Sequence, residues 1–137
     1  MITIINFGMG NIGSIANMIK RIGYRSEITS DISQIELAEK IILPGVGRFD
    51  KAIQNLKSLD LYDLIKKKAI KDKTPILGIC LGMQIMCNKS EEGKEPGLGL
   101  VDAEVRKLTL SENSKIKIPH MGWNLIEQKK KIHYLRE

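Results

Sequence analysis

Short apolar runs that stop at glycines, each followed by a helical pattern, constrain the fold of this 137-residue chain most strongly. Residues 2–6 form the first run, and Ile12, Ile15, Ala16 and Ile19 then recur at spacings of three and four residues, which predicts a strand, a tight turn and a helix. Strands that alternate with helices over short connections form a parallel sheet covered on both sides. We therefore expect an α/β fold with an open, mostly parallel sheet, helices on both faces, and its site at the carboxyl ends of the strands.

The same alternation continues along the chain, within what we expect to be a single domain over residues 1–137. The further elements that it predicts are strands at 24–29, 40–43, 75–79 and 103–110, a helix at 49–71 that breaks near 58–60, and a short helix after Cys80. The run at 75–79 is apolar throughout, as is typical of a strand buried on both faces, so we expect it to lie centrally in the sheet.

Composition narrows the classes of function. The net charge of +6 comes from scattered lysine runs such as Lys66-Lys67-Lys68, and only six residues are aromatic, which indicates a solvated surface and no nucleic-acid partner. No apolar run approaches the ~18 residues that a membrane span needs, and the N-terminus has no secretory signal, so we expect no membrane partner and a cytoplasmic location. Cys80 and Cys87 have no second pair and no His at ligand spacing, so we expect reduced thiols, no metal and no cofactor.

The sequence Gly78-Ile79-Cys80-Leu81-Gly82 stands where the apolar run at 75–79 turns into a helix. It has the form of a nucleophile elbow with Cys in place of Ser, where small residues must flank the nucleophile because the turn is tight. The helix offers backbone N–H groups and its positive dipole end to a thiolate. Cys80 is therefore the candidate nucleophile, and a buried structural cysteine is the alternative. Cys87, two turns further along the expected helix, lacks this context, and we assign it to packing.

The loop Pro44-Gly45-Val46-Gly47 follows another expected strand, and alone it would indicate only a turn. Acyl chemistry at Cys80 needs about two hydrogen-bond donors aimed where negative charge develops on the attacked carbonyl oxygen. We expect the Leu81 N–H to be one donor, and the loop from Gly45 to Gly47 to supply the other.

A second glycine pattern, Gly8-Met9-Gly10-Asn11-Ile12-Gly13, has the G-x-G-x-x-G form of a dinucleotide-binding turn, and Asp31 stands about where a ribose-binding acid is expected. Asn11 also suits the N-cap of the first helix, which explains the turn without any nucleotide. Dinucleotide binding stays open as an alternative.

Four other polar residues receive no catalytic role from the residue pattern alone. Glu91 and Glu92 are typical of a charged loop. His120 and His133 are the two histidines of the sequence, and a lone His near an apolar Trp is more often a structural residue than a base.

Three segments together resemble one known family, the class I (triad type) glutamine amidotransferases. They are the elbow extended to Met83-Gln84, the Pro44–Gly47 loop, and Pro119-His120-Met121-Gly122-Trp123-Asn124. The resemblance runs from Met1 to about Leu125, and within the family it is to the glutaminase subunits of histidine biosynthesis. It implies a flavodoxin-like three-layer fold and L-glutamine as substrate, with ammonia passed to a (β/α)8-barrel cyclase subunit in a heterodimer.

The resemblance also implies roles for residues at matching motif positions. Cys80 attacks the glutamine amide carbonyl, ammonia leaves, and water hydrolyses a glutamyl thioester. Gly47 and Leu81, beside Gly45, are implied to donate backbone N–H groups to the oxyanion. Gln84 and Glu92 are implied to hold the substrate glutamine. Three residues are implied to lie near the synthase partner: Asn11, His120 and Trp123.

One departure from the family pattern is large. The family completes its triad with a His-Pro-Glu motif on a later strand, and in this sequence no His is followed two residues later by Glu. We therefore expect a fold that is incomplete at its C-terminus and a glutaminase activity lower by on the order of 10³-fold or more. We also expect uncovered apolar surface, with marginal stability or a need for a partner.

Two other functions stay open at this point. A paralogous amidotransferase subunit would supply ammonia to a sugar-modifying enzyme of surface polysaccharide synthesis. A chain without the triad His and Glu would also suit a non-catalytic binding module.

Overall fold

The computed structural model describes residues 1–110, 118–119, 121–125 and 127. The chain divides into two units, Met1–Lys107 and Leu108–Glu137. The expectation of a single domain over 1–137 stays a prediction. All the helices and strands named below belong to the first unit.

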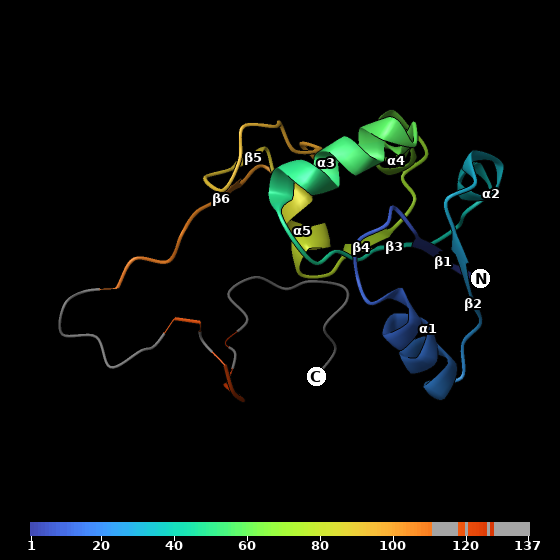
Figure 1. The fold of residues 1–137 in the computed structure, drawn as a ribbon. Coiled ribbons are helices and arrows are strands. Elements are labelled where there is room, and N and C mark those ends of the chain that lie inside the picture. The colour runs from blue at the N-terminus through green and yellow to red at the C-terminus, as the bar shows by residue number, and fades with distance from the viewer. Residues whose placement is uncertain (111–117, 120, 126, 128–137) are drawn as a thin grey trace. The chain divides into compact units, whose positions relative to one another are not determined.

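Four parallel strands form the main sheet, in the order β2-β1-β3-β4 (Figure 1). They are β1 (Ile2–Ile5), β2 (Ser26–Thr29), β3 (Ile41–Leu43) and β4 (Ile76–Gly78). Each falls inside a stretch that the sequence pattern predicts to be a strand, because β-branched apolar residues suit a pleated, buried surface. The predicted open parallel sheet is confirmed.

Five helices connect or follow these strands. They are α1 (Ile12–Arg21), α2 (Ile32–Glu36), α3 (Phe49–Ser58), α4 (Leu61–Ile70) and α5 (Leu81–Ile85). The predicted break near 58–60 lies between α3 and α4, where Asp60 has a φ of 56°. None of the helices among the described residues has the length and apolar character to cross a membrane.

The stretch expected as a strand at 103–110 pairs over two residues only. It forms β6 (Glu104–Val105), which lies parallel to β5 (Lys89–Ser90) in a separate two-stranded sheet. Strand β5 falls in a polar stretch that the sequence pattern does not mark, because two residues carry no readable alternation.

Side chains of β1 and β3 alternate between two cores, as the period of a strand requires. Ile5 and Leu43 join a large cluster with α2, α3, α4 and α5, whereas Ile4 and Ile42 join a smaller one with α1. Figure 1 shows α1 on one side of the sheet and α3 and α4 on the other, so the predicted cover on both faces is confirmed. Fully buried side chains of the larger cluster include Phe49, Ile53, Leu56, Leu61 and Ile65.

The prediction that the strand at 75–79 lies centrally and is buried on both faces is wrong for the described residues. Strand β4 is the last strand of the sheet, and the Leu77 side chain is 59% exposed. Leu77 pairs in register with Ile42 and so lies on the α1 face, where the apolar cluster contains residues of β1, β3 and α1 only. An apolar run in the sequence does not show whether a helix covers both faces of the strand, so the exposure of Leu77 could not be predicted from it.

The short helix α2 begins at a well-formed cap. Asp31 Oδ1 accepts hydrogen bonds from the Ser33 N–H at 2.8 Å, the Ser33 hydroxyl at 2.5 Å and the Gln34 N–H at 3.3 Å. These bonds, the one from the Ser33 hydroxyl first, lower the pKa of the Asp31 carboxyl. A carboxylate at this position satisfies N–H groups that have no partner within the helix.

We predict that Asp31→Ala lowers the unfolding temperature at pH 7 and that the difference narrows in acid. The pKa of Asp31 is lower in the folded chain than in the unfolded one, so its stabilisation is present above the unfolded value of about 4 and is lost as the pH falls through the folded value. Thermal unfolding followed by circular dichroism at pH 7, 5 and 3 measures this. A difference that stays constant over that range would contradict the prediction.

Candidate active site

Cys80 lies in the turn between β4 and α5 in a backbone conformation that non-glycine residues rarely adopt. Its φ is 54° and its ψ is −117°, and it is the N-cap residue of α5. The side chain is exposed, so the alternative of a buried structural cysteine does not describe it. A positive φ at a cysteine marks local strain of the kind that projects a nucleophile from a strand-to-helix turn.

The glycines on either side of Cys80 are required by close packing. A Cβ atom on Gly78 would lie 2.6 Å from Met83 Cα, and one on Gly82 would overlap the carbonyl oxygen of Leu43 at the end of β3. Both contacts are with backbone, which cannot move aside as a flexible side chain does. The small residues that the motif shows are therefore a steric need of this turn.

The loop Pro44–Gly47 packs directly against the start of α5. A Cβ atom on Gly45 would lie 2.8 Å from the Gly82 nitrogen, and the Ile79 N–H donates to the Leu43 carbonyl at 3.0 Å. Gly47 is exposed and has a φ of 121°. Within residues 1–110, neither the Gly47 N–H nor the Leu81 N–H donates a hydrogen bond to another protein atom. The structure thus brings together the loop and the elbow that the sequence predicts to act jointly.

A cleft of about 600 Å³ opens beside this turn. Gln84 lies in its wall, and the Gln84 N–H donates to the Cys80 carbonyl at 3.1 Å, which places it one turn from the candidate nucleophile. Three residues predicted from sequence, Gly47, Gln84 and Glu92, line the same cleft. The remaining lining residues are Ser90, Glu91, Val105, Arg106 and Lys107.

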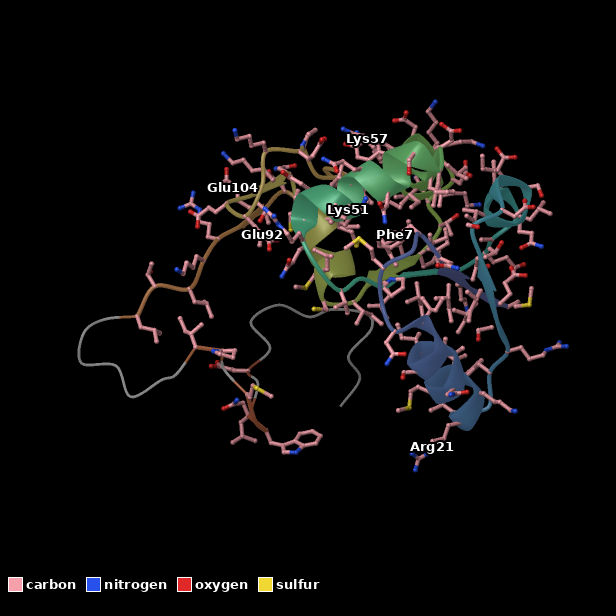
Figure 2. The ribbon with its side chains drawn as sticks, viewed as in Figure 1. Phe7, Arg21, Lys51, Lys57, Glu92 and Glu104 are labelled. Carbon is pink, nitrogen blue, oxygen red and sulfur yellow. The ribbon has the colours of Figure 1, made fainter. Side chains whose placement is uncertain are left out.

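Glu92 has a structural contact that sequence reasoning missed. Its Oε2 atom accepts a hydrogen bond from the Phe49 N–H at 2.9 Å, at the first residue of α3. Arg48, the N-cap residue, makes no side-chain cap bond. Glu92, 43 positions beyond Phe49, supplies the acceptor instead. Figure 2 shows Glu92 beside the N-terminal end of α3. No local motif signals this cap, because the acceptor comes from a distant part of the chain.

Asp50 is a second residue that the sequence does not single out. Its carboxylate accepts hydrogen bonds from the Glu95 N–H at 2.9 Å and from the Lys94 N–H at 2.9 and 3.0 Å. These backbone bonds, the one from Glu95 first, hold the pKa of Asp50 below its ordinary value. Lys57 forms an ion pair with Glu95 at 2.6 Å. The turn after β5 is thereby fastened to α3.

The glycine turn at residues 8–13 has local explanations that involve no nucleotide. The Asn11 side chain accepts from the Ser14 N–H at 3.2 Å and caps α1, as predicted. A Cβ atom on Gly13 would meet nothing within 4 Å, so the third glycine lacks the close helix–strand packing that a dinucleotide fold demands of it. Asp31, the expected ribose ligand, is engaged at the cap of α2.

The residues predicted to face a partner fall in both units. Asn11 lines a second hollow, of about 680 Å³, with Lys51 and Asn55 among its other lining residues. Trp123 belongs to the second unit and is fully exposed. His120 lies outside the described residues, and so does His133.

Cys87 follows α5 instead of lying on it, because the helix ends at Ile85. Its side chain is half-buried, and burial raises the pKa of its thiol. That environment suits the packing role predicted for it, since a raised pKa leaves little thiolate at neutral pH.

An exposed cysteine at a strand-to-helix turn occurs in more than one class of enzyme, and the family of the chain distinguishes them. The model of the family "Glutamine amidotransferase class-I" matches residues 3–135. The chain belongs to this family. The strand-to-helix turn at Cys80 and the glycine loop at 45–47 both fall within the residues that this family model matches.

Relatives of this amidotransferase chain include subunits of one synthase. It is 54% identical over 127 residues to imidazole glycerol phosphate synthase subunit HisH 2 of Methanococcus maripaludis, and the alignment covers 93% of this chain and 62% of the relative. It is 42% identical over 126 residues to the subunit HisH 2 of Pseudomonas aeruginosa, 92% of this chain and 61% of the relative. The subunit HisH of Bacillus cereus is 46% identical over 133 residues, 96% of this chain and 61% of the relative. The chain thus spans about three fifths of the length of these relatives.

A solved structure supports the fold. The protein titled "Crystal structure of glutamine amidotransferase" matches with a TM-score of 0.63 at 18% identity, over 76% of this chain and 55% of that one. The predicted flavodoxin-like α/β fold of a class I amidotransferase is confirmed.

We predict that alanine has opposite effects at two glycines of this amidotransferase chain. Gly82→Ala forces a Cβ onto the Leu43 carbonyl and should cost about 3 kcal/mol or more of unfolding free energy. Gly13→Ala adds its Cβ in open space within α1 and should stabilise by up to about 1 kcal/mol. Urea unfolding of both variants measures this. Equal stability of Gly82→Ala and the parent would contradict the packing described for the elbow.

Proposed function

We propose that this protein is the glutaminase subunit of an imidazole glycerol phosphate synthase and releases ammonia from L-glutamine for histidine biosynthesis in the cytoplasm. The observation that supports this most is the exposed Cys80 at a strained strand-to-helix turn, with the Gly45 backbone packed against the start of the helix that follows. The identity of 54% to a HisH subunit supports the choice of this synthase over other ammonia acceptors.

The proposed chemistry begins at the Cys80 sulfur. The thiolate attacks the side-chain amide carbon of glutamine, and negative charge develops on the carbonyl oxygen. The Leu81 and Gly47 N–H groups, which donate to no other protein atom among the described residues, would stabilise this charge. The carbon–nitrogen bond breaks, and the leaving nitrogen takes up the proton that the Cys80 thiol lost and departs as ammonia. Water then hydrolyses the glutamyl thioester to glutamate and free Cys80.

The cleft beside α5 is the proposed place for the rest of the glutamine molecule. Gln84 offers both a donor and an acceptor there. Glu92 uses Oε2 for the Phe49 N–H, which leaves Oε1 for the α-ammonium group of the substrate. Lys107 and Arg106, whose guanidinium is paired with Glu104 at 2.9 Å, line the same cleft and are the proposed positive charges for the α-carboxylate. An amino acid with both charged groups therefore suits this cleft.

The proposed reaction also needs a group that transfers a proton. In a complete triad a His takes the thiol proton and passes it to the leaving nitrogen, while a carboxylate orients the His. Residues 1–137 contain no His-Pro-Glu sequence. We assign no step to His120 or His133.

The proposed partner is a (β/α)8-barrel cyclase subunit that receives the ammonia. Asn11 and the hollow that it lines with Lys51 and Asn55 are the proposed contact region in the first unit. Trp123 is proposed to contribute from the second unit, where its exposed ring offers a large apolar area to a partner.

Covalent labelling with the chloroketone analogue of glutamine tests the proposal. In the parent chain we expect Cys80 to displace chloride and form a thioether, with saturation kinetics, protection by L-glutamine, and a rate at least about tenfold above that of Cys87 because binding concentrates the reagent at the elbow. Cys80→Ser should lose the labelling, and Cys87→Ser should keep it. Peptide mass spectrometry gives the modified residue, and non-saturating labelling that L-glutamine does not slow would contradict the proposal.

A further inference from the structure

One wall of the cleft beside α5 is formed by a segment that is hydrogen-bonded to the start of α3. We call residues 90–97 the cleft segment, because it carries three of the lining residues, Ser90, Glu91 and Glu92. It begins at Ser90, the last residue of β5, and its other residues belong to no helix or strand. A segment with so little secondary structure of its own depends on contacts with its neighbours for a fixed conformation.

Two adjacent residues at the start of α3 supply those contacts. The Phe49 N–H donates to Glu92 Oε2, and the Asp50 carboxylate accepts from the Lys94 and Glu95 N–H groups. The cleft segment is therefore held by the side chain of Glu92 and by the backbone two and three residues further on. Rotation of Glu92 away from the cleft would have to break the first contact, and displacement of the segment would have to break the second.

The contact at Asp50 is close as well as bonded. A Cβ atom on Gly93 would overlap Asp50 Oδ1, so the segment approaches the carboxylate as closely as a glycine backbone allows. Asp50 is not among the residues that line the cleft. Its effect on a bound ligand must pass through the segment that it holds.

The segment has further ties. The Glu91 N–H donates to the Val105 carbonyl at 2.9 Å, and the Glu91 carboxylate accepts from the Lys107 N–H at 2.8 Å, so the residue before Glu92 is held by the chain around β6. The Lys57–Glu95 ion pair is formed by a lysine that is 44% exposed, and such pairs are screened by solvent. The Tyr62 hydroxyl donates to the Gly97 carbonyl at 2.7 Å, five residues beyond Glu92. The Asp50 carboxylate accepts hydrogen bonds from two backbone N–H groups, and hydrogen bonds to a charged acceptor are stronger than those between neutral groups.

We propose that Asp50 is a positioning residue for glutamine: it holds the cleft segment so that Glu92 stays in the wall that it shares with Gln84. This inference rests on the proposed function. It adds that affinity for glutamine depends on a carboxylate outside the cleft, whereas the reactivity of the Cys80 thiol does not.

Kinetics of Cys80 alkylation by the glutamine chloroketone test this on the full 137-residue chain. For Asp50→Ala we expect the half-saturating concentration to rise by about tenfold, because the wall residue Glu92 loses its fixed place. The maximal alkylation rate should change less than about twofold, and the rate with iodoacetamide, which does not use the cleft, should equal that of the parent. Gly93→Ala places a Cβ atom against the Asp50 carboxylate and disturbs the same contact from the side of the segment. It should also raise the half-saturating concentration, and it replaces Asp50→Ala as the test if that variant does not fold.

Asp31→Ala is the matched control. Asp31, like the half-buried Asp50, is an aspartate that accepts backbone N–H groups, but it is exposed, caps α2 and makes no hydrogen bond to the cleft segment. It should lower the unfolding temperature without changing the half-saturating concentration. An unchanged half-saturating concentration in Asp50→Ala or Gly93→Ala, an equal rise in Asp31→Ala, or a parallel fall in the iodoacetamide rate would each overturn the inference. A parent chain that is not labelled saturably would instead contradict the proposed function, and the inference with it.

Discussion

The structure depends on one backbone-to-backbone contact, in which the start of α5 packs against the end of β3. Gly82 lies so close to the Leu43 carbonyl, and Gly45 so close to the Gly82 nitrogen, that no side chain fits at either glycine. The pairing of β3 with β4 and the bond from the Ile79 N–H to the Leu43 carbonyl bring the two strand ends together. Cys80, with its strained conformation, lies in the turn that this contact closes, and the glycine loop packs against the start of α5 through the same contact.

Helix α3 organises the loops around this elbow. The Asn55 side chain donates to the Phe7 carbonyl at 3.0 Å and so holds the turn that follows β1. Asp50 and Lys57 hold the turn after β5. Figure 2 shows Lys51 and Lys57 along α3, with Phe7 near the same helix. The helix is anchored in the large core through Ile53 and other fully buried residues. A rigid helix that binds loops on several sides lets short, irregular segments line a cleft with fixed geometry.

Most of the fold and the strand-to-helix turn that carries the proposed nucleophile could be predicted from the sequence, because both depend on local patterns. Helix and strand periods place all four strands of the main sheet and the break at Asp60, and the glycines around Cys80 mark the elbow. The exposure of Leu77 could not be predicted, since an apolar run does not show what covers it. The contacts of Glu92 with Phe49 and of Lys94 and Glu95 with Asp50 were also missed, because they join residues 43 to 45 positions apart and depend on the tertiary fold.

Nuclear magnetic resonance of the amide groups at the elbow tests the central claim most directly. An aldehyde analogue of glutamine, with CHO in place of the side-chain amide, forms a thiohemiacetal with Cys80 and places an oxygen where the oxyanion would develop. We predict that the Leu81 and Gly47 amide protons then move downfield together, while the Gly13 amide in α1 stays unchanged. Formation of the thiohemiacetal with neither the Leu81 nor the Gly47 amide shifted would contradict the assignment of these groups as the oxyanion donors.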